Sequence, residues 1–362
     1  MTILVTGGCG FIGSNFIHEW AALGLERVIN LDALTYAGNP QNLSALPLER
    51  HELVRGDILD KTLVESLMRE RRPSAIVHFA AESHVDRSIH GPAAFVETNV
   101  KGTFTLLEAA KGYYSSLEGP EKEAFRFLAV STDEVYGSLG PQDPPFTEKT
   151  PYAPNSPYSA SKAAADHLAR AYRQTYGLPV LSTNCSNNYG PYQFPEKLVP
   201  LLILNALAEK PIPVYGDGLQ IRDWLYVSDH CAALRLVLAK GRVGESYNIG
   251  GGASLANLDI IRAILSEVDR LAPRADGTAR LDLITHVKDR PGHDRRYAVD
   301  AGKIRAELGF VPSHSLALGV EKTVKWYLSN QPWVQSVVNL SYRDWLKAQY
   351  GEEPSSPSAE PL

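Results

Sequence analysis

The stretch Thr2-Ile3-Leu4-Val5-Thr6-Gly7-Gly8-Cys9-Gly10-Phe11-Ile12-Gly13 decides the fold of this chain. It begins as an apolar run typical of a buried strand and passes directly into a turn with glycines at positions 7, 10 and 13. Gly7 permits a tight turn, and Gly13 lets a following helix pack closely against the strand. Backbone N–H groups in such a turn can approach a pyrophosphate at the helix N-terminus. A glycine-rich turn can also be merely a turn, but this order predicts a dinucleotide site.

Further β-rich runs alternate with helical patterns through the first half of the chain. They predict strands over Ile3–Thr6, Val28–Asp32, Ala75–Ala80, Phe127–Ser131 and Val180–Asn184. This rhythm is typical of an α/β fold with a Rossmann-type, doubly wound parallel sheet.

After about Tyr192, proline-rich turns and an irregular polar stretch, Thr285–Asp294, indicate a smaller C-terminal substrate-binding lobe. We therefore expect residues 1–192 to form the nucleotide-binding domain, with 223–256 and about 311–345 returning to it. Residues 193–222 and 257–310 are expected to form the lobe. The Ser/Pro/Glu-rich end, 351–362, is expected to be disordered.

Composition and charge narrow the class of protein. With 362 residues, a net charge of −5 and no basic stripe, the chain is a poor candidate for a nucleic-acid binder. Its apolar runs are too short to span a bilayer, and no basic leader precedes the first strand. Cys9, Cys185 and Cys231 are scattered without metal-like spacing, so we expect no metal and reduced thiols in a cytoplasmic protein.

Asp32 lies 19 residues after Gly13, at the end of the second predicted strand. A carboxylate there accepts hydrogen bonds from the adenosine ribose and repels a 2′-phosphate. No arginine follows in Ala33-Leu34-Thr35-Tyr36, so the sequence favours NAD over NADP. Asp57, after the next predicted strand, is equally consistent with an adenine contact and with a turn-forming role.

Tyr158 and Lys162 are four residues apart and share one helix face. A nearby ammonium and a positive nicotinamide ring would favour the phenolate, so Tyr158 could act as a base on a sugar hydroxyl. Taken alone, such a pair is usually solvated at the surface. Its position after the glycine turn and a strand ending in Ser131-Thr132 favours catalysis.

Two adjacent carboxylates, Asp133 and Glu134, follow Thr132, whose hydroxyl could bind the substrate hydroxyl that is oxidised. Two carboxylates confined to a cleft resist ionising together, so one pKa should rise and supply an acid beside a base. Elsewhere we would interpret such a pair as a solvated loop. At the carboxyl edge of a parallel sheet, they favour an elimination reaction.

Several long strings extend this interpretation: Ala80–Ser88, Thr132–Gly137, Ser186–Tyr192, Pro195–Leu198, Ile221–Val227 and Asp289–Asp294. In them the chain resembles the extended short-chain dehydrogenase/reductase family and, within it, the dTDP-glucose 4,6-dehydratases. The resemblance covers Thr6 to about Tyr297. The Thr-Asp-Glu and Asp-Arg-Pro-Gly-His strings are more selective than the glycine turn.

The resemblance implies roles for individual residues. Asp133 would donate a proton, Glu134 would be the base at C5, Tyr158 the base at the C4 hydroxyl, and Lys162 would hold the ribose. NAD would be lined by Gly7, Gly10, Phe11, Ile12, Gly13, Asp32, Ala33, Leu34, Thr35, Asp57, Ile58, Ala80, Ala81, Glu82, Ser83, His84, Thr98, Tyr158, Lys162 and Asn188. The nucleotide-sugar would meet Ser83, Thr132, Asn187, Lys197, Leu198, Pro213, Val214, Tyr215, Arg222, Asn257, Asp289, Arg290, Pro291, Gly292 and His293.

The implied activity is the conversion of dTDP-glucose to dTDP-4-keto-6-deoxyglucose in deoxysugar biosynthesis, with NAD regenerated in each turnover. A 4-epimerase would have no evident use for the two acids. The GDP-mannose 4,6-dehydratases use NADP as a family, whereas Asp32 favours NAD. UDP-glucose as substrate and a non-catalytic NAD-binding sensor are further alternatives. The stretch Gly250–Ala253 departs from the family pattern at the nucleoside end, as does Cys9 where alanine is common. The family also implies a homodimer.

Overall fold

A computed structural model of the chain describes residues 2–289 and 293–338. Its centre is a seven-stranded sheet in the order β10-β6-β5-β4-β1-β2-β3, and every neighbouring pair is parallel. The predicted Rossmann-type fold is confirmed. The strands are β1 (Thr2–Thr6), β2 (Arg27–Asp32), β3 (His51–Arg55), β4 (Ala75–His78), β5 (Arg126–Thr132), β6 (Val180–Cys185) and β10 (Ser246–Ile249).

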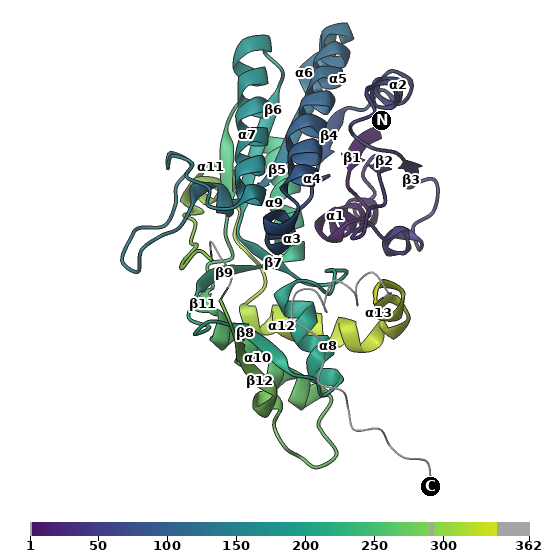
Figure 1. Cartoon of the computed structure of the whole chain (residues 1–362). Helices are drawn as coiled ribbons and strands as arrows, with labels where there is room; N and C mark the ends of the chain where they lie inside the picture. Colours follow the sequence, from purple (N-terminus) through teal and green to yellow (C-terminus); the bar gives the residue numbers. More distant parts are fainter. Residues whose placement is uncertain (1, 290–292, 339–362) are drawn as a thin grey trace.

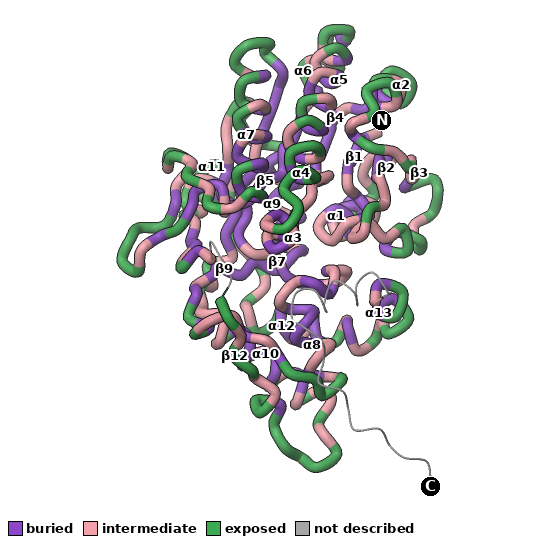
Figure 2. The backbone as a smooth tube through the Cα atoms, viewed as in Figure 1, coloured by how far each residue is buried: buried purple, intermediate pink, exposed green. Residues whose placement is uncertain are grey.

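Helices cover both faces of this sheet, as Figure 1 shows. Ile3 and Val5 of β1 point to one face and join a core with α1 and α9, whereas Leu4 points to the other face and joins α2, α5 and α7. Alternate residues of a strand face opposite sides, so a continuous apolar run suits a strand buried on both faces. The strands β1, β2, β4, β5, β6 and β10 are accordingly buried over most of their length, whereas the edge strand β3 is only partly buried (Figure 2).

The helices of this half are α1 (Phe11–Ala22), α2 (Lys61–Arg71), α3 (Val85–His90), α4 (Pro92–Phe95), α5 (Thr103–Ser116), α6 (Gly119–Ala124), α7 (Pro157–Tyr176) and α9 (Val227–Lys240). Short helical turns lie at η1 (Pro40–Leu43) and η3 (Asp133–Tyr136), and a π-helical segment, η2 (Val96–Gly102), leads into α5.

Within the described residues, the lobe holds two small sheets and four helices. One sheet has the order β11-β9-β7, from Ser254–Ala256, Ile221–Tyr226 and Asn187–Tyr189, and the other pairs β8 (Ile212–Tyr215) with β12 (Ile284–Val287) in parallel. The stretch Thr285–Asp294 was expected to be irregular, and this is wrong over Thr285–Val287. Pairing with β8 makes a strand there that the polar sequence does not signal. The lobe helices are α8 (Leu198–Leu207), α10 (Asn257–Leu271), α12 (Leu316–Ser329) and α13 (Gln331–Val337).

The expected division into two domains stays a prediction, to which the packing adds detail. Helix α9 lies against α1 on the large sheet, and α11 (Gly302–Leu308) packs on β10. Although residues 311–345 are expected from the sequence to return to the nucleotide-binding domain, α12 packs against α8 and α10 in the core of the lobe. The expected tail, 351–362, lies outside the described residues.

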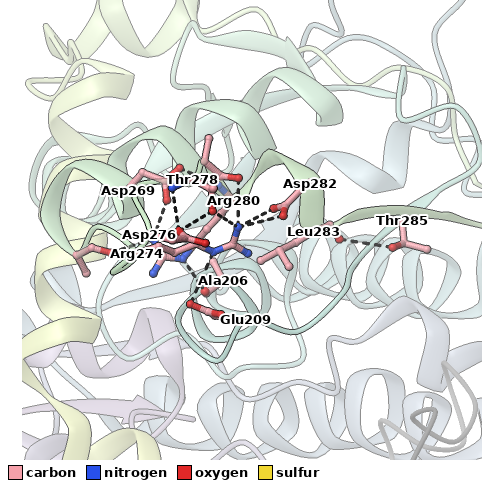
Figure 3. Close-up of polar contacts among 12 residues, drawn as sticks. Ala206, Glu209, Asp269, Arg274, Asp276, Thr278, Arg280, Asp282, Leu283 and Thr285 are labelled. Carbon is pink, nitrogen blue, oxygen red and sulfur yellow. Dashed lines mark hydrogen bonds and ion pairs between the residues drawn. The ribbon is translucent and has the colours of Figure 1, made fainter. Parts of the chain in front are cut away.

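Two arginines, Arg274 and Arg280, join the ends of helices α8 and α10 to the turn before β12 (Figure 3). We call these contacts the arginine clamp. Arg280 is buried and donates to the Asp269 carboxylate at 2.6 Å and to the Ala206 carbonyl at 2.8 Å, which joins the ends of α10 and α8. Arg274 reaches both oxygens of Asp282 at 2.9 and 3.0 Å. Arg280 and Asp282 form the turn η4 (Arg280–Leu283), which leads directly into β12. The clamp therefore fixes where β12 begins beside β8.

Candidate active site

A cavity of about 320 Å³ lies at the carboxyl ends of β1, β2, β4, β5 and β6. Open α/β sheets bind ligands at this edge, where the strand order reverses. The cavity unites the glycine turn, Asp32, the Tyr158/Lys162 pair and the acidic pair. Predicted residues that line it are Gly7, Gly10, Phe11, Ile12, Gly13, Asp32, Ala33, Thr35, Asp57, Ile58, Ala80, Ala81, Glu82, Ser83, Thr98, Thr132, Asp133, Glu134, Tyr158, Lys162, Asn187, Asn188 and Lys197.

The glycine turn is tight enough to exclude side chains. Gly7 has φ +73°, and a Cβ there would lie 2.6 Å from the backbone nitrogen of Ala80. A Cβ on Gly13 would lie 2.5 Å from the Gly7 carbonyl oxygen. Helix α1 starts directly after Gly10, and no side chain in the described part of the protein caps its N-terminus. The turn and the helix end can therefore receive a phosphate without displacing protein atoms.

Cys9 fits this turn because its thiol points into the core. It is fully buried, and the Asn30 amide donates to its sulfur at 3.4 Å. Burial raises the pKa of the Cys9 thiol to about 12, so it stays neutral and unreactive.

The carboxylate of Asp32 is held by the backbone of this region. Its two oxygens accept hydrogen bonds from the N–H groups of Cys9 and Leu34, both at 2.8 Å. Burial raises the pKa of Asp32, while these two bonds favour the charged form. Asp57 also lines the cavity and accepts a bond from the Leu59 N–H at 2.9 Å. Both roles considered for Asp57 are therefore compatible with its geometry.

Tyr158 and Lys162 lie in the first turns of α7, which starts at a capping box formed by Ser156 and Ser159. Both are buried, and the Lys162 ammonium donates to the Val130 carbonyl at 2.9 Å. Burial and then the Glu134 charge raise the pKa of Tyr158 well above its usual value. The lowering expected from Lys162 therefore does not outweigh these effects in the protein chain alone, where the lysine ammonium is bound to β5.

Asp133 is the more buried of the two acids and opens η3. Its pKa is raised well above the usual value, first by burial and second by the Glu134 charge. The rise agrees with the expectation for a carboxylate pair, although burial is the larger cause. Its Oδ2 accepts no hydrogen bond from the described residues. Thr132 caps η3, accepting from the Glu134 N–H at 3.3 Å. An acid held protonated beside a second carboxylate can perform general acid and base steps.

Two predicted cofactor residues, Leu34 and His84, do not line the cavity. Leu34 has φ +55°, and its side chain packs against the core shared with α1. His84 is buried at the start of α3, where its ring bonds the Arg87 N–H and the Glu196 carbonyl, both at 3.4 Å. Their chain neighbours Ala33, Thr35 and Ser83 do line the cavity.

Most residues predicted to bind the nucleotide end gather in the lobe, beyond the cavity lining. The His293 ring bonds Asp289 at 2.6 Å and stacks edge-on with Tyr215, and Gln220 donates to Asp289 at 3.1 Å. Asn257 begins α10, and its side-chain oxygen is buried without a hydrogen bond from the described residues. Pro213, Val214 and Leu198 lie on β8 and at the start of α8. Arg290, Pro291 and Gly292 lie outside the described residues.

Arg222 lies between the acidic pair at the cavity and the residues of the lobe that are predicted to bind the nucleotide end. It is buried on β9, stacks over Tyr297 at 4.2 Å and donates to the Asp294 carbonyl at 2.8 Å. Its charge also acts on Asp133. The neighbouring loop, Gly250–Ala253, wraps Asp223, whose carboxylate accepts the N–H groups of Gly251 and Ala253 at 2.9 and 2.8 Å.

Three residues around the site were not foreseen from the sequence. Asn99 of η2 bonds the backbone of Glu82 twice and donates to the Ser161 hydroxyl at 2.8 Å, so it ties the cavity wall to α7. Glu196 lines the cavity and pairs with Arg87 at 2.8 Å. Asp166 is buried one turn after Lys162. Glu196 lies in the string Pro195–Leu198, but its partner Arg87 is 109 residues away, and Asn99 is 62 residues from Ser161.

Within residues 2–289 and 293–338, no group of three or more His, Cys, Asp or Glu side chains is placed to hold a metal ion. In the same part of the chain, no helix has the length and apolarity needed to cross a bilayer.

Comparison with known proteins agrees with this geometry. A family model described as GDP-mannose 4,6 dehydratase matches residues 4–323. A dTDP-glucose 4,6-dehydratase from Xanthomonas campestris is 60% identical over 343 residues, which are 94% of this chain and 97% of the relative. The chain belongs to the dTDP-glucose 4,6-dehydratase family.

Solved structures give the same result for the fold. DesIV, a dTDP-glucose 4,6-dehydratase from Streptomyces venezuelae solved with NAD bound, has a TM-score of 0.83 and 47% identity, covering 93% of this chain and 100% of DesIV. A UDP-glucose 4-epimerase from Thermus thermophilus in complex with NAD has a TM-score of 0.79 and 31% identity, covering 91% and 100%. The fold alone therefore does not separate the family's dehydration from epimerisation, and the site residues must do so.

Proposed function

We propose that this protein catalyses the NAD-dependent dehydration of dTDP-glucose to dTDP-4-keto-6-deoxyglucose, a step of deoxysugar biosynthesis. The observation that carries the proposal is the arrangement around one cavity. The buried acid Asp133, its neighbour Glu134 and the Tyr158/Lys162 pair share it with the glycine turn. The 60% identity to a dTDP-glucose 4,6-dehydratase supports the same substrate.

NAD fits the cavity, because the turn at Gly7, Gly10 and Gly13 leaves room for a pyrophosphate and Asp32 stands where the adenosine ribose would lie. The Asp32 carboxylate would repel the 2′-phosphate of NADP, which argues against the GDP-mannose enzymes of the family. When bound, NAD supplies the hydride acceptor and donor and a positive charge that favours the Tyr158 phenolate.

The side chains would then act in sequence on one hexose. Tyr158 takes the proton of the C4 hydroxyl as hydride leaves C4, while Thr132 bonds the same hydroxyl. The new carbonyl acidifies the C5 hydrogen, which Glu134 removes, and Asp133 gives its proton to the departing C6 hydroxyl, so that water leaves. Hydride would return to C6, Glu134 would give its proton back to C5, and the proton held by Tyr158 would pass through solvent to restore Asp133. The net change is the loss of water, without net oxidation.

Charged groups near the cavity suit a diphosphate. Arg222 and Lys197 supply positive charge, and Lys197 is anchored on the Ser83 carbonyl at 2.8 Å. The cluster of Tyr215, Gln220, Asp289 and His293 on β8 and its neighbours is proposed to hold the nucleoside end.

The experiment that tests the function is incubation with dTDP-, UDP- and GDP-glucose, followed by mass spectrometry and proton NMR of the sugar nucleotides. We expect the loss of one water from dTDP-glucose at the highest rate. A product of unchanged mass with inverted C4 would indicate an epimerase. Stoichiometric NAD binding without turnover on any of the three would indicate a sensor instead.

We further propose that the protein is a cytoplasmic homodimer that pairs through η2, α5 and α7. Val96 and Phe104 expose 55% and 46% of their surface on this side, and α5 packs against α7. The three cysteines are free and buried, as suits a reducing compartment. Sedimentation at micromolar concentration should give a dimer, and Phe104→Asp should shift it toward monomer. A monomer in the unchanged protein would contradict the proposal.

A further inference from the structure

A buried network lies behind Lys162, on the side away from the cavity. Lys162 and Asp166 are one turn apart on α7, and each exposes less than a tenth of its surface, 8% and 7%. The Lys162 ammonium donates to the Val130 carbonyl at 2.9 Å, and the Asp166 carboxylate accepts from the Ser131 hydroxyl at 2.7 Å. Val130 and Ser131 are consecutive residues of β5. The two charged groups are therefore docked side by side on one stretch of strand.

Four neighbouring groups favour the charged form of Asp166. One carboxylate oxygen accepts hydrogen bonds from the Ser131 hydroxyl at 2.7 Å, the Tyr152 hydroxyl at 3.1 Å and the Asn184 amide at 3.4 Å. Burial is the largest effect and raises the pKa of Asp166 overall, whereas Lys162 and these three donors oppose the rise. The donors and the cationic neighbour therefore stabilise the carboxylate against the effect of burial.

The other groups that face Lys162 carry no negative charge at neutral pH. His78 on β4 is neutral, because burial lowers its pKa to about 3. Burial raises the pKa of the Cys185 thiol on β6, and that of Tyr158 on the same helix is raised as well. Asp133 and Glu134 act on Tyr158 and Cys185, but the groups that act on Lys162 besides His78 are Asp166 and Cys185. Asp166 is thus the carboxylate among these partners.

We propose that Asp166 is a positioning residue, the buried counter-ion that keeps the Lys162 ammonium charged and seated on the Val130 carbonyl. The inference rests on the proposed function, in which Lys162 holds the cofactor ribose and supports Tyr158. Burial alone lowers the pKa of Lys162, and Asp166 is the largest cause that raises it. Without this carboxylate the amine would lose its proton at a lower pH, and with the proton the charge that the ribose and Tyr158 require.

The test is the pH dependence of the first chemical step. Reduction of bound NAD by dTDP-glucose in a single turnover occurs before Asp133 is needed. The rate of this reduction should fall at high pH as Lys162 loses its proton, and we call this fall the alkaline limb of the pH profile. In Asp166→Asn we expect this limb to move to lower pH by roughly one to three units, the usual effect of an opposite charge at close range. Tyr152→Phe is the matched control, since it removes one donor to Asp166 and keeps the carboxylate. Its limb should stay in place.

A second measurement separates this inference from the proposed function. The dissociation constant of NAD is measured by calorimetry without any sugar nucleotide. In Asp166→Asn it should be about ten-fold higher at pH 9 than at pH 7, and in the unchanged protein it should be nearly the same at both pH values. If the unchanged protein binds NAD but does not dehydrate dTDP-glucose, the proposed function fails while this measurement still decides the role of Asp166.

An alkaline limb and an NAD affinity that do not change in Asp166→Asn would overturn the counter-ion role. An equal displacement in Tyr152→Phe would overturn it too, because the network would then be merely structural. Should Asp166→Asn fail to fold, Asp166→Glu carries the test. It keeps the charge and should keep the limb, so a displacement of a unit or more would contradict the inference.

Discussion

Tyr36 donates a hydrogen bond to the Glu196 carboxylate at 2.9 Å and so joins the loop after β2 to the segment that enters the lobe. The second oxygen of Glu196 accepts from Arg87 at 2.8 Å, and the Arg87 guanidinium stacks over the Tyr36 ring at 3.9 Å. Glu196 is almost fully buried and lines the cavity. These three residues form a latch that ties the loop after β2 and helix α3 to the cavity wall at Glu196. A reaction that returns its hydride needs such a latch, because the cofactor must stay between the two transfers.

Glu196→Gln should loosen this latch. The glutamine keeps an acceptor for Tyr36 but removes the charge that pairs with Arg87. Loss of this buried charge should weaken the contact between Glu196 and Arg87 by about 1.4 kcal/mol or more. We expect NADH to dissociate about ten-fold faster, as measured by stopped-flow fluorescence. Glu121→Gln is the matched control, because Glu121 pairs with Arg72 at the exposed surface. A dissociation rate unchanged from the parent would show that the latch does not retain the cofactor.

Asp133→Asn should separate the two halves of the reaction. The amide cannot give a proton to the C6 hydroxyl, so elimination should slow by roughly 10²- to 10⁴-fold, the usual contribution of a general acid. Oxidation at C4 relies on Tyr158 and should be largely retained. After mixing with dTDP-glucose, the variant should accumulate reduced cofactor, seen by absorbance, without loss of water by mass spectrometry. Equal loss of both steps would contradict the role given to Asp133.

The same substitution should stabilise the protein at neutral pH. The folded-state pKa of Asp133 is raised, so its contribution to stability is fully present below the unfolded value near 4 and is lost as pH rises through the folded value. At pH 7.5 the carboxyl group of Asp133 ionises more readily in the unfolded chain than in the folded protein, which favours unfolding. Asp133→Asn removes this effect. Its melting temperature should exceed that of the parent, and the difference should shrink toward pH 4. Calorimetric scans at both pH values measure it, and a difference that grows on acidification would refute the expectation.

The fold could be predicted because its decisive signals are local. The apolar run Ile3-Leu4-Val5 and the glycines that follow specify a buried strand and a turn within a dozen residues. The strand β10 has no such run, because Ser246-Tyr247-Asn248-Ile249 is short and half polar, and it pairs with β6. The strand β4 was expected to continue to Ala80 but ends at His78, because Phe79 and Ala80 turn to close over Gly7.

The site could be predicted as far as its residues belong to motifs. Tyr158, Lys162 and Asp133 were placed correctly at the cavity because their strand and helix are fixed by the sheet. The direction of the Tyr158 pKa was not foreseen, because its largest cause is burial, which depends on how the whole site packs around the phenol. Glu196 is 109 residues from its partner Arg87, a distance over which a single sequence carries no pairing signal.

A pair of glycines offers the sharpest test of the nucleotide turn. Gly7 and Gly24 have almost the same backbone, with φ +73° and +70°, so replacing either by alanine should cost about 1 kcal/mol of unfolding free energy through the backbone alone. Their surroundings differ, because the added Cβ would lie 2.6 Å from the Ala80 nitrogen at Gly7 but 4.0 Å from the nearest atom, in Arg50, at Gly24. The loop must therefore move in Gly7→Ala and stay in place in Gly24→Ala. We expect NAD affinity, measured by calorimetry, to fall by a factor of ten or more only in Gly7→Ala, and an equal fall in both variants would mean that the turn does not hold the pyrophosphate.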